Sequence, residues 1–120
     1  MKTQEIKFNS KKTSYSILIG ANILSVLPKK IKSICPNTKK IALIFDKRLP
    51  FKYKKTISNS LKNYEVTTLN FVPSEKSKSL KSVNFFLDKL LSKNLNRSDL
   101  VIGIGGGITG DLVGFVASIF

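Results

Sequence analysis

The sequence predicts an α/β domain with a mostly parallel β-sheet, and three observations support this prediction. Short apolar runs alternate along the chain with segments of helical periodicity, as they do in βαβ units. Residues 41–45 are continuously apolar, which is typical of a strand buried on both faces of a parallel sheet. A second apolar run at residues 100–104 leads directly into three glycines and then into a helical segment.

The N-terminal part of the chain predicts a β-hairpin followed by an interrupted helix. Residues 4–8 alternate between polar and apolar side chains, and residues 15–19 form a second extended run after a polar turn. Apolar side chains recur at helical spacing over residues 22–34, where Pro28 is expected to distort or split the helix. Cys35 is expected to be half-buried near the end of this helix, without a catalytic role.

The middle of the chain repeats a pattern of strand and helix. The strand at residues 40–45 is followed by a helix that opens at Pro50, and residues 66–72 form the next strand. Residues 79–92 carry the clearest amphipathic helix, because their apolar side chains fall on one stripe. The side chains that these two helices are expected to bury are Tyr53, Ile57, Leu61, Leu80, Val83, Phe86, Leu87, Leu90 and Leu91.

The last strand and the last helix meet at the run of glycines. We expect residues 100–104 to be the central strand of the sheet and residues 108–120 to form a helix that exposes some apolar surface. Gly114 is expected to let this helix pack closely on the sheet. Phe115 and Phe120 are expected to belong to the core rather than to a ligand site.

The chain is strongly basic, with a formal net charge of +14 at pH 7. Such a charge can indicate a nucleic-acid-binding protein, but here nearly all of it is lysine spread along the chain, with little aromatic interleaving. We therefore expect no nucleic-acid partner and keep a small basic nucleic-acid-binding protein as an alternative. The field of the surface favours anionic ligands, such as a dinucleotide or a phosphorylated sugar acid.

Other features of the composition concern the cellular compartment. No apolar run approaches the roughly 20 residues that span a membrane, and residues 1–10 lack the apolar core of a signal peptide. The single cysteine excludes an internal disulfide. These observations favour a cytoplasmic protein with no membrane partner.

Three polar segments follow the predicted strands of the sheet. Asp46 follows the first strand, residues 74–78 follow the second, and the glycine turn follows the third. In parallel sheets ligands bind at the carboxyl ends of the strands, so this arrangement predicts a nucleotide cleft. Asp46 has two interpretations that the sequence leaves open: an acceptor for the ribose hydroxyls, or a turn residue or N-cap before the next helix.

The glycine turn has the features of a phosphate-binding corner. Three consecutive glycines are expected to allow positive φ angles and a close approach by a ligand, because no Cβ stands in the way. The N-terminus of the following helix can then hold a phosphate with its backbone N–H groups. Asp111 is expected in the first turn, where it either complements the helix dipole or reaches a ligand hydroxyl or amide.

The residues of this corner also resemble a known family. Residues 105–115, G-G-G-I-T-G-D-L-V-G-F, resemble the signature of the 3-dehydroquinate synthases, which use NAD and a divalent metal. Iron-containing alcohol dehydrogenases share the glycine triplet, but the G-D-L-x-G-F tail favours the synthases. Residues 73–79, P-S-E-K-S-K-S, resemble the family segment G-E-x-x-K-[ST], with Ser74 in place of the glycine. The resemblance implies a Rossmann-like fold with flanking helices.

The resemblance implies a role in NAD binding for several residues. Asp46 would contact the adenosine ribose, and Glu75 would contact the adenosine side while Lys78 supplies positive charge. The alternative for residues 73–79 is a polar loop in which Ser77 or Ser79 caps the next helix. The residues that match the family's cofactor-binding segments are Asp46, Ser74, Glu75, Lys78, Gly106, Gly107, Ile108, Thr109, Gly110 and Asp111.

The resemblance also implies what this chain does not contain. The family holds zinc or cobalt with one Glu and two His, whereas this chain has no His. We therefore expect residues 1–120 to be a partial NAD-binding domain, without catalytic residues or metal ligands, from an enzyme that is a homodimer and binds an anionic sugar acid phosphate. The alternatives within the superfamily are another sugar phosphate cyclase, such as a 2-deoxy-scyllo-inosose synthase, and an iron-type polyol dehydrogenase.

Overall fold

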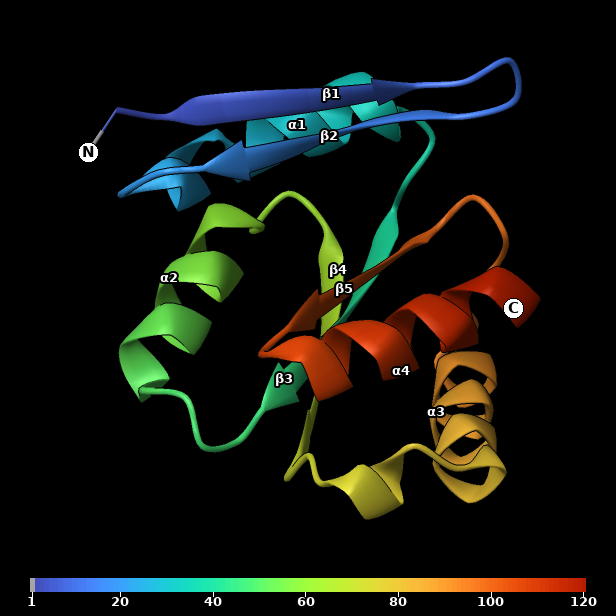
Figure 1. Cartoon of the computed structure of the whole chain (residues 1–120). Coiled ribbons are helices and arrows are strands. Elements are labelled where there is room, and N and C mark those ends of the chain that lie inside the picture. The colour runs from blue at the N-terminus through green and yellow to red at the C-terminus, as the bar shows by residue number, and fades with distance from the viewer. Residues whose placement is uncertain (1) are drawn as a thin grey trace.

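The computed structural model describes residues 2–120, which contain two separate sheets (Figure 1). An antiparallel hairpin pairs β1 with β2, and a parallel sheet has the strand order β4-β3-β5. Both were predicted. The strands are β1 (Gln4–Asn9), β2 (Ser14–Ile19), β3 (Lys40–Asp46), β4 (Glu65–Phe71) and β5 (Leu100–Ile104).

The helices follow the predicted order. Pro28 lies in the first turn of α1, where its missing N–H costs no hydrogen bond. The residues before it form a separate, short 3₁₀ helix. The split expected at Pro28 is thus confirmed. The helices are η1 (Ile23–Val26), α1 (Leu27–Ile34), α2 (Phe51–Ser60), η2 (Glu75–Ser77), α3 (Leu80–Ser92) and α4 (Gly107–Ile119).

Strand β3 is the middle strand of the parallel sheet. It pairs with β4 on one side and β5 on the other, whereas β5 pairs only with β3 among the described residues. Within the described residues β3 is therefore the middle strand and β5 an outer one. Burial gives the reason: the five apolar residues of β3 are at most 2% exposed, while every residue of β5 keeps some exposure.

The core has two halves, one on each face of the sheet. Ala42 and Ile44 face α3 and α4, and their neighbours Ile41, Leu43 and Phe45 face α1 and α2, as the twofold alternation of a strand requires. The buried helical side chains are Val83, Phe86, Leu90, Leu112, Val113 and Val116 on the first face and Ile31 and Ile57 on the second. Helices therefore cover both faces of the sheet.

Three of the helical side chains predicted to be buried are exposed. Leu80 and Leu91 are 73% and 61% exposed, because α3 meets the core only along the line of Val83, Phe86 and Leu90. Tyr53 is 42% exposed, while the other two residues predicted on its helix face are buried.

The amino ends of β3 and β5 are held together by polar contacts with the backbone. One carboxylate oxygen of Asp99 accepts hydrogen bonds from the backbone N–H groups of Lys39 (3.2 Å) and Lys40 (2.9 Å), and the other accepts from that of Asn96 (3.0 Å). The buried Thr38 hydroxyl donates to the carbonyl of Ser98 at 3.1 Å. We call this end of the sheet the amino edge.

Several apolar side chains remain exposed on the hairpin and on the last helix. Phe115 and Ile119 of α4 are 49% and 53% exposed, which confirms the expectation of apolar surface there. None of the helices described in residues 2–120 is long and apolar enough to cross a membrane. The exposed apolar side chains of the hairpin are Ile6, Phe8, Tyr15, Ile17 and Ile19.

Candidate functional site

The three parallel strands end at one edge of the sheet, which we call the carboxyl edge. Strand β3 ends at Asp46, β4 leads through Ser74 into η2, and β5 leads through the glycine turn into α4. The backbone N–H of Lys47 donates to the carbonyl of Phe71 at 2.9 Å, which joins the first two of these strand ends. The polar segments predicted to meet therefore lie on the same edge.

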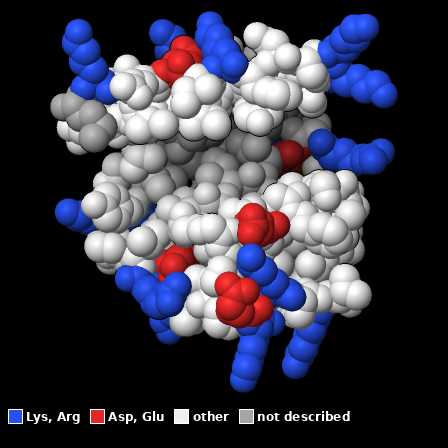
Figure 2. Space-filling model, viewed as in Figure 1, with Lys and Arg blue, Asp and Glu red and all other residues white. Residues whose placement is uncertain are grey.

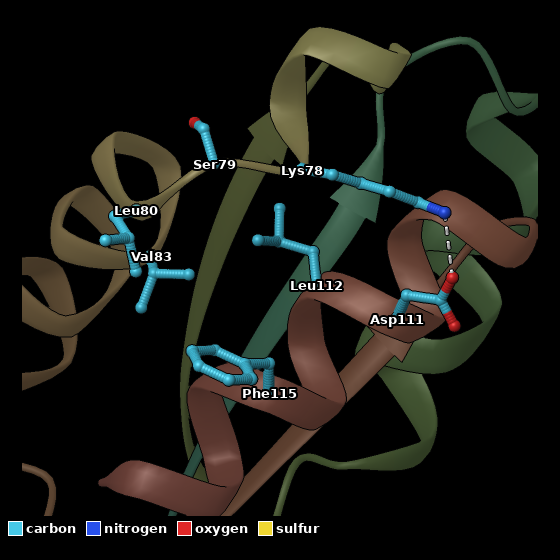
Figure 3. A pocket seen from close by; sticks show the side chains of 7 residues that line it. All are labelled: Lys78, Ser79, Leu80, Val83, Asp111, Leu112 and Phe115. Atoms are coloured by element: carbon cyan, nitrogen blue, oxygen red, sulfur yellow. Dashed lines mark ion pairs between the residues drawn. The ribbon is translucent and has the colours of Figure 1, made fainter.

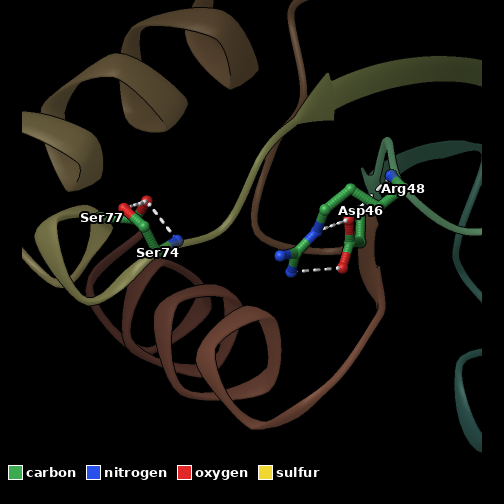
Figure 4. A network of polar contacts seen from close by, with 4 residues as sticks. All are labelled: Asp46, Arg48, Ser74 and Ser77. Carbon is green, nitrogen blue, oxygen red and sulfur yellow. Dashed lines mark hydrogen bonds and ion pairs between the residues drawn. The ribbon is translucent and has the colours of Figure 1, made fainter.

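Asp46 is clamped by Arg48 (Figure 4). The carboxylate is buried, and its Oδ1 accepts hydrogen bonds from the backbone N–H (2.9 Å) and the Nε (3.2 Å) of Arg48. Its Oδ2 accepts from the Nη2 of Arg48 at 3.1 Å. These side-chain hydrogen bonds lower the pKa of Asp46 below its ordinary value, so the carboxylate is ionised at neutral pH. Asp46 is thus a turn residue, but Pro50, not Asp46, occupies the N-cap of α2.

Lys78 and Asp111 form an ion pair across the carboxyl edge (Figure 3). The Lys78 Nζ lies 3.1 Å from Oδ2 of Asp111, and the hydrogen bond to this carboxylate raises the pKa of Lys78. The charges of Asp111 and Glu75 add to the same shift. Both side chains are well exposed, so the pair contributes little to stability. Its effect is to connect the segment after β4 with helix α4.

Asp111 lies beyond the first turn of α4. The helix begins at Gly107, with Gly106 as its N-cap, and its first turn contains no acidic residue. The prediction of a first-turn carboxylate that complements the helix dipole is therefore wrong. Asp111 points instead toward Lys78 and away from the core.

The glycines at this corner matter because they have no side chain, not because they adopt a positive φ angle. Among the described residues no glycine has a positive φ, so that expectation is wrong. A Cβ on Gly105 would lie 2.5 Å from the Oγ1 of Thr109, and a Cβ on Gly103 would lie 3.0 Å from Val113. These two glycines let α4 lie close to β5. Gly114 has no such neighbour within 4 Å, so the packing role predicted for it is wrong.

The N-terminal end of α4 is open. A Cβ built on Gly106, Gly107 or Gly110 would meet nothing within 4 Å. The first N–H groups of a helix have no partner inside the helix, and here they lie next to free space. This cradle fits the phosphates of a dinucleotide. The Oγ1 of Thr109, by contrast, is buried without a hydrogen-bond partner, so only the backbone of Thr109 is available to a ligand.

The serines after β4 cap the helices that follow. Ser77 accepts a hydrogen bond from the backbone N–H of Ser74 at 3.1 Å, within η2 (Figure 4). Ser79 is the N-cap of α3 and accepts from the backbone N–H of Ser82 at 3.3 Å. The capping role expected for Ser79 is confirmed, while Ser77 caps the shorter η2. Glu75 and Lys76 are exposed.

A pocket of about 310 Å³ lies between the start of α3 and helix α4 (Figure 3). Of the residues predicted for the site, only Lys78 and Asp111 line it. Phe115 also lines it and is 49% exposed, so its predicted place in the core is wrong, whereas the half-buried Phe120 packs against the core. Sequence reasoning missed Leu80 and Phe115 as pocket residues, because apolar residues in helices usually face the core. The lining residues are Lys78, Ser79, Leu80, Val83, Asp111, Leu112 and Phe115.

The basic side chains on one face of the molecule are spread out rather than gathered in one patch. Figure 2 shows Lys and Arg projecting around the whole outline of this face. Within residues 2–120 no three His, Cys, Asp or Glu side chains are grouped so that they could hold a metal ion. A divalent metal therefore does not fit residues 2–120 by themselves.

Comparison with known proteins finds relatives that share one name. Residues 68–120 match the family model described as the N-terminal part of 3-dehydroquinate synthase. The 3-dehydroquinate synthase of Pelagibacter ubique is 43% identical over 116 residues, which are 97% of this chain and 32% of that protein. This chain is similar to the N-terminal part of the 3-dehydroquinate synthases. The enzyme of the same name from Streptococcus thermophilus is 36% identical over 118 residues, 97% of this chain and 33% of that protein.

A solved structure shows the same fold. A 2-deoxy-scyllo-inosose synthase, in complex with carbaglucose-6-phosphate, NAD⁺ and Co²⁺, matches with a TM-score of 0.82 at 22% identity. The match covers 99% of this chain and 32% of that one, and it confirms the Rossmann-like α/β fold. The chain spans about a third of the length of the relatives that it matches.

Proposed function

We propose that this chain is the cofactor-binding part of a 3-dehydroquinate synthase. That enzyme converts 3-deoxy-D-arabino-heptulosonate 7-phosphate to 3-dehydroquinate and phosphate in the shikimate pathway, the route to the aromatic amino acids. The observation that carries the proposal is the 43% identity to a protein of that name over 97% of the chain. The glycine corner with its G-D-L-x-G-F tail lies inside the matched region.

The cofactor that we propose is NAD, bound at the carboxyl edge. When bound, NAD takes a hydride from a secondary alcohol and later returns it, so that it is not consumed. The residues of this chain would bind and orient it. The open N-terminal end of α4, from Gly106 to Asp111, would hold the pyrophosphate and the nicotinamide ribose, while Asp46, Ser74, Glu75 and Lys78 would hold the adenosine side.

The other parts of the reaction belong to residues outside this chain. The residues described here offer no metal site, so we assign the zinc or cobalt and the grip on the anionic sugar acid phosphate to the remainder of the enzyme. On this view residues 1–120 form a partial NAD-binding domain of a cytoplasmic homodimer. The chain alone is expected to produce no 3-dehydroquinate.

A second candidate is a related sugar phosphate cyclase. It is favoured by the TM-score of 0.82 to a 2-deoxy-scyllo-inosose synthase, although the identity is only 22%. The higher identity to the named 3-dehydroquinate synthases favours the first candidate. A polyol dehydrogenase and a small nucleic-acid-binding protein have no such support.

A binding titration tests the cofactor proposal. NADH added to the purified chain should show enhanced fluorescence that saturates, and Asp111→Asn should weaken this binding by about tenfold, the effect of losing one charged hydrogen bond. Asp88→Asn is the matched control, because Asp88 is an exposed carboxylate on α3, away from the carboxyl edge. It should leave binding unchanged.

Two results would contradict the proposal. The first is a chain that is folded by circular dichroism but binds neither NADH nor NAD⁺. The second is tight binding to duplex DNA that weakens steeply with salt, which would favour the nucleic-acid-binding alternative.

A further inference from the structure

The end of β3 carries two opposite charges that act differently on a dinucleotide. In dinucleotide-binding folds an acidic residue at such a strand end bonds the ribose 2′-hydroxyl of NAD, whereas an Arg accommodates the 2′-phosphate of NADP. This chain has both, Asp46 and Arg48, and they are joined by hydrogen bonds at both carboxylate oxygens. The question is which of the two a ligand would meet.

The geometry leaves Arg48 exposed to a ligand, while Asp46, whose side chain is only 8% exposed, keeps one acceptor position. Oδ1 of Asp46 accepts two hydrogen bonds from Arg48, and Oδ2 accepts a third. Oδ2 therefore has the capacity to accept one more hydrogen bond, from a ribose hydroxyl. The side chain of Arg48 is 61% exposed, and it uses only Nε and Nη2 toward Asp46. A guanidinium has five donors in a planar fork, which suits bidentate contact with a phosphate.

The charge balance weakens discrimination against a phosphate at this position. A free carboxylate would repel a 2′-phosphate, but the Asp46 carboxylate is neutralised by the guanidinium at 3.1 Å. Lys47 stands between them in the sequence and is exposed, and the chain as a whole is strongly positive. The local field therefore favours an additional anionic group.

We infer that Arg48 is a specificity-determining residue that lets the ribose end of the site accept a 2′-phosphate, so that the chain binds NADP as well as NAD. This inference rests on the proposed function, because it assumes a dinucleotide at the carboxyl edge. Asp46 contacts the ribose hydroxyls through Oδ2, and Arg48 supplies the donors for the phosphate while it keeps the carboxylate in place.

The test compares NADH and NADPH by fluorescence titration of the chain. For the wild-type protein, the two dissociation constants should lie within about tenfold of each other. Arg48→Ala should weaken NADPH binding by about tenfold more than it weakens NADH binding, because the loss of the hold on Asp46 affects both dinucleotides, whereas only the 2′-phosphate loses charged hydrogen bonds and meets an unmasked carboxylate. Lys47→Ala is the control for the loss of one positive charge, and it should change the ratio by less than about threefold.

The possible outcomes separate this inference from the proposed function. If neither dinucleotide binds the folded wild-type chain, the proposed function fails and this inference fails with it. If NADH binds but Arg48→Ala leaves the ratio of the two constants unchanged, only this inference is overturned, and Arg48 merely holds the turn. Arg48→Gln, which keeps most of the side chain, gives the same comparison if the alanine variant does not fold.

Discussion

The two edges of the parallel sheet differ in how their polar groups are satisfied. At the amino edge, Asp99 and Thr38 make hydrogen bonds with the backbone of neighbouring segments. At the carboxyl edge, the charged side chains pair with one another, Asp46 with Arg48 and Lys78 with Asp111, and both cations are substantially exposed. The amino edge therefore uses its polar groups to hold the strands, while the carboxyl edge pairs charged side chains and leaves the cations exposed.

The largest expected effect is the loss of the Asp99 carboxylate. Asp99→Ala removes the acceptor of three backbone hydrogen bonds, so the free energy of unfolding should fall by about 2–3 kcal/mol. Urea unfolding followed by circular dichroism measures this, with Asp88→Ala as the control. A loss of less than about 0.5 kcal/mol would mean that the amino edge does not hold the strands as described.

The second effect concerns the contact between β5 and α4. Gly105→Ala would place a Cβ 2.5 Å from the hydroxyl of Thr109, so the helix must shift, and we expect a loss of stability of about 2 kcal/mol. Gly106→Ala is the control, because its Cβ would meet nothing within 4 Å, and it should cost no more than about 1 kcal/mol, the effect of a poorer N-cap residue. Equal losses in the two variants would exclude the close approach at Gly105 as the cause.

The third prediction makes the same substitution at both edges. Thr38→Val removes a hydroxyl that donates to the Ser98 carbonyl and should lower stability by about 1 kcal/mol. Thr109→Val removes a buried hydroxyl that has no partner and should raise stability by about 1 kcal/mol. The shapes are nearly the same, so the opposite signs, read from urea unfolding midpoints, test the polar groups themselves. A destabilised Thr109→Val would show that its hydroxyl does have a partner.

The smallest effect is expected on acidification. Hydrogen bonds from the side chain of Arg48 lower the pKa of Asp46, and although burial opposes the shift, three backbone donors lower the pKa of Asp99. Both carboxylates therefore stabilise the fold fully above their unfolded pKa of about 3.9, and this contribution is lost as the pH falls through the lower folded values. Unfolding midpoints should be flat from pH 7 to about 5 and fall below about pH 4. The unfolding midpoint of Asp99→Asn should fall less steeply with decreasing pH than that of the wild type. An equal slope would contradict the role of Asp99.

The elements of this fold were predictable because their signals are local. Continuous burial of β3, the amphipathic stripe of α3 and the strand, turn and helix at the glycines can each be read from a short window of sequence. The sheet order could not be read in this way, because it depends on which strands pair. Within residues 2–120 the pairing makes β3 the middle strand.

The site was predictable as a set of segments but not as contacts. The end of β3, the loop after β4 and the glycine turn are brought to one edge as expected from parallel strands. The pairing of Lys78 with Asp111 joins residues far apart in the sequence, and no local pattern encodes it. The conformation of the glycines depends on how α4 lies on β5, which the identity of the glycines alone does not determine.

The position of β3 in the sheet has a consequence for the order of synthesis. The ribosome makes this most buried strand before both of the strands that border it, and β5 follows only after more than fifty further residues. Until then one side of β3 presents unpaired N–H and C=O groups, which invite pairing with other chains. Nascent chains that stop before Leu100 should therefore aggregate or bind holding chaperones more than chains that extend through α4, in which β5 covers this side of β3.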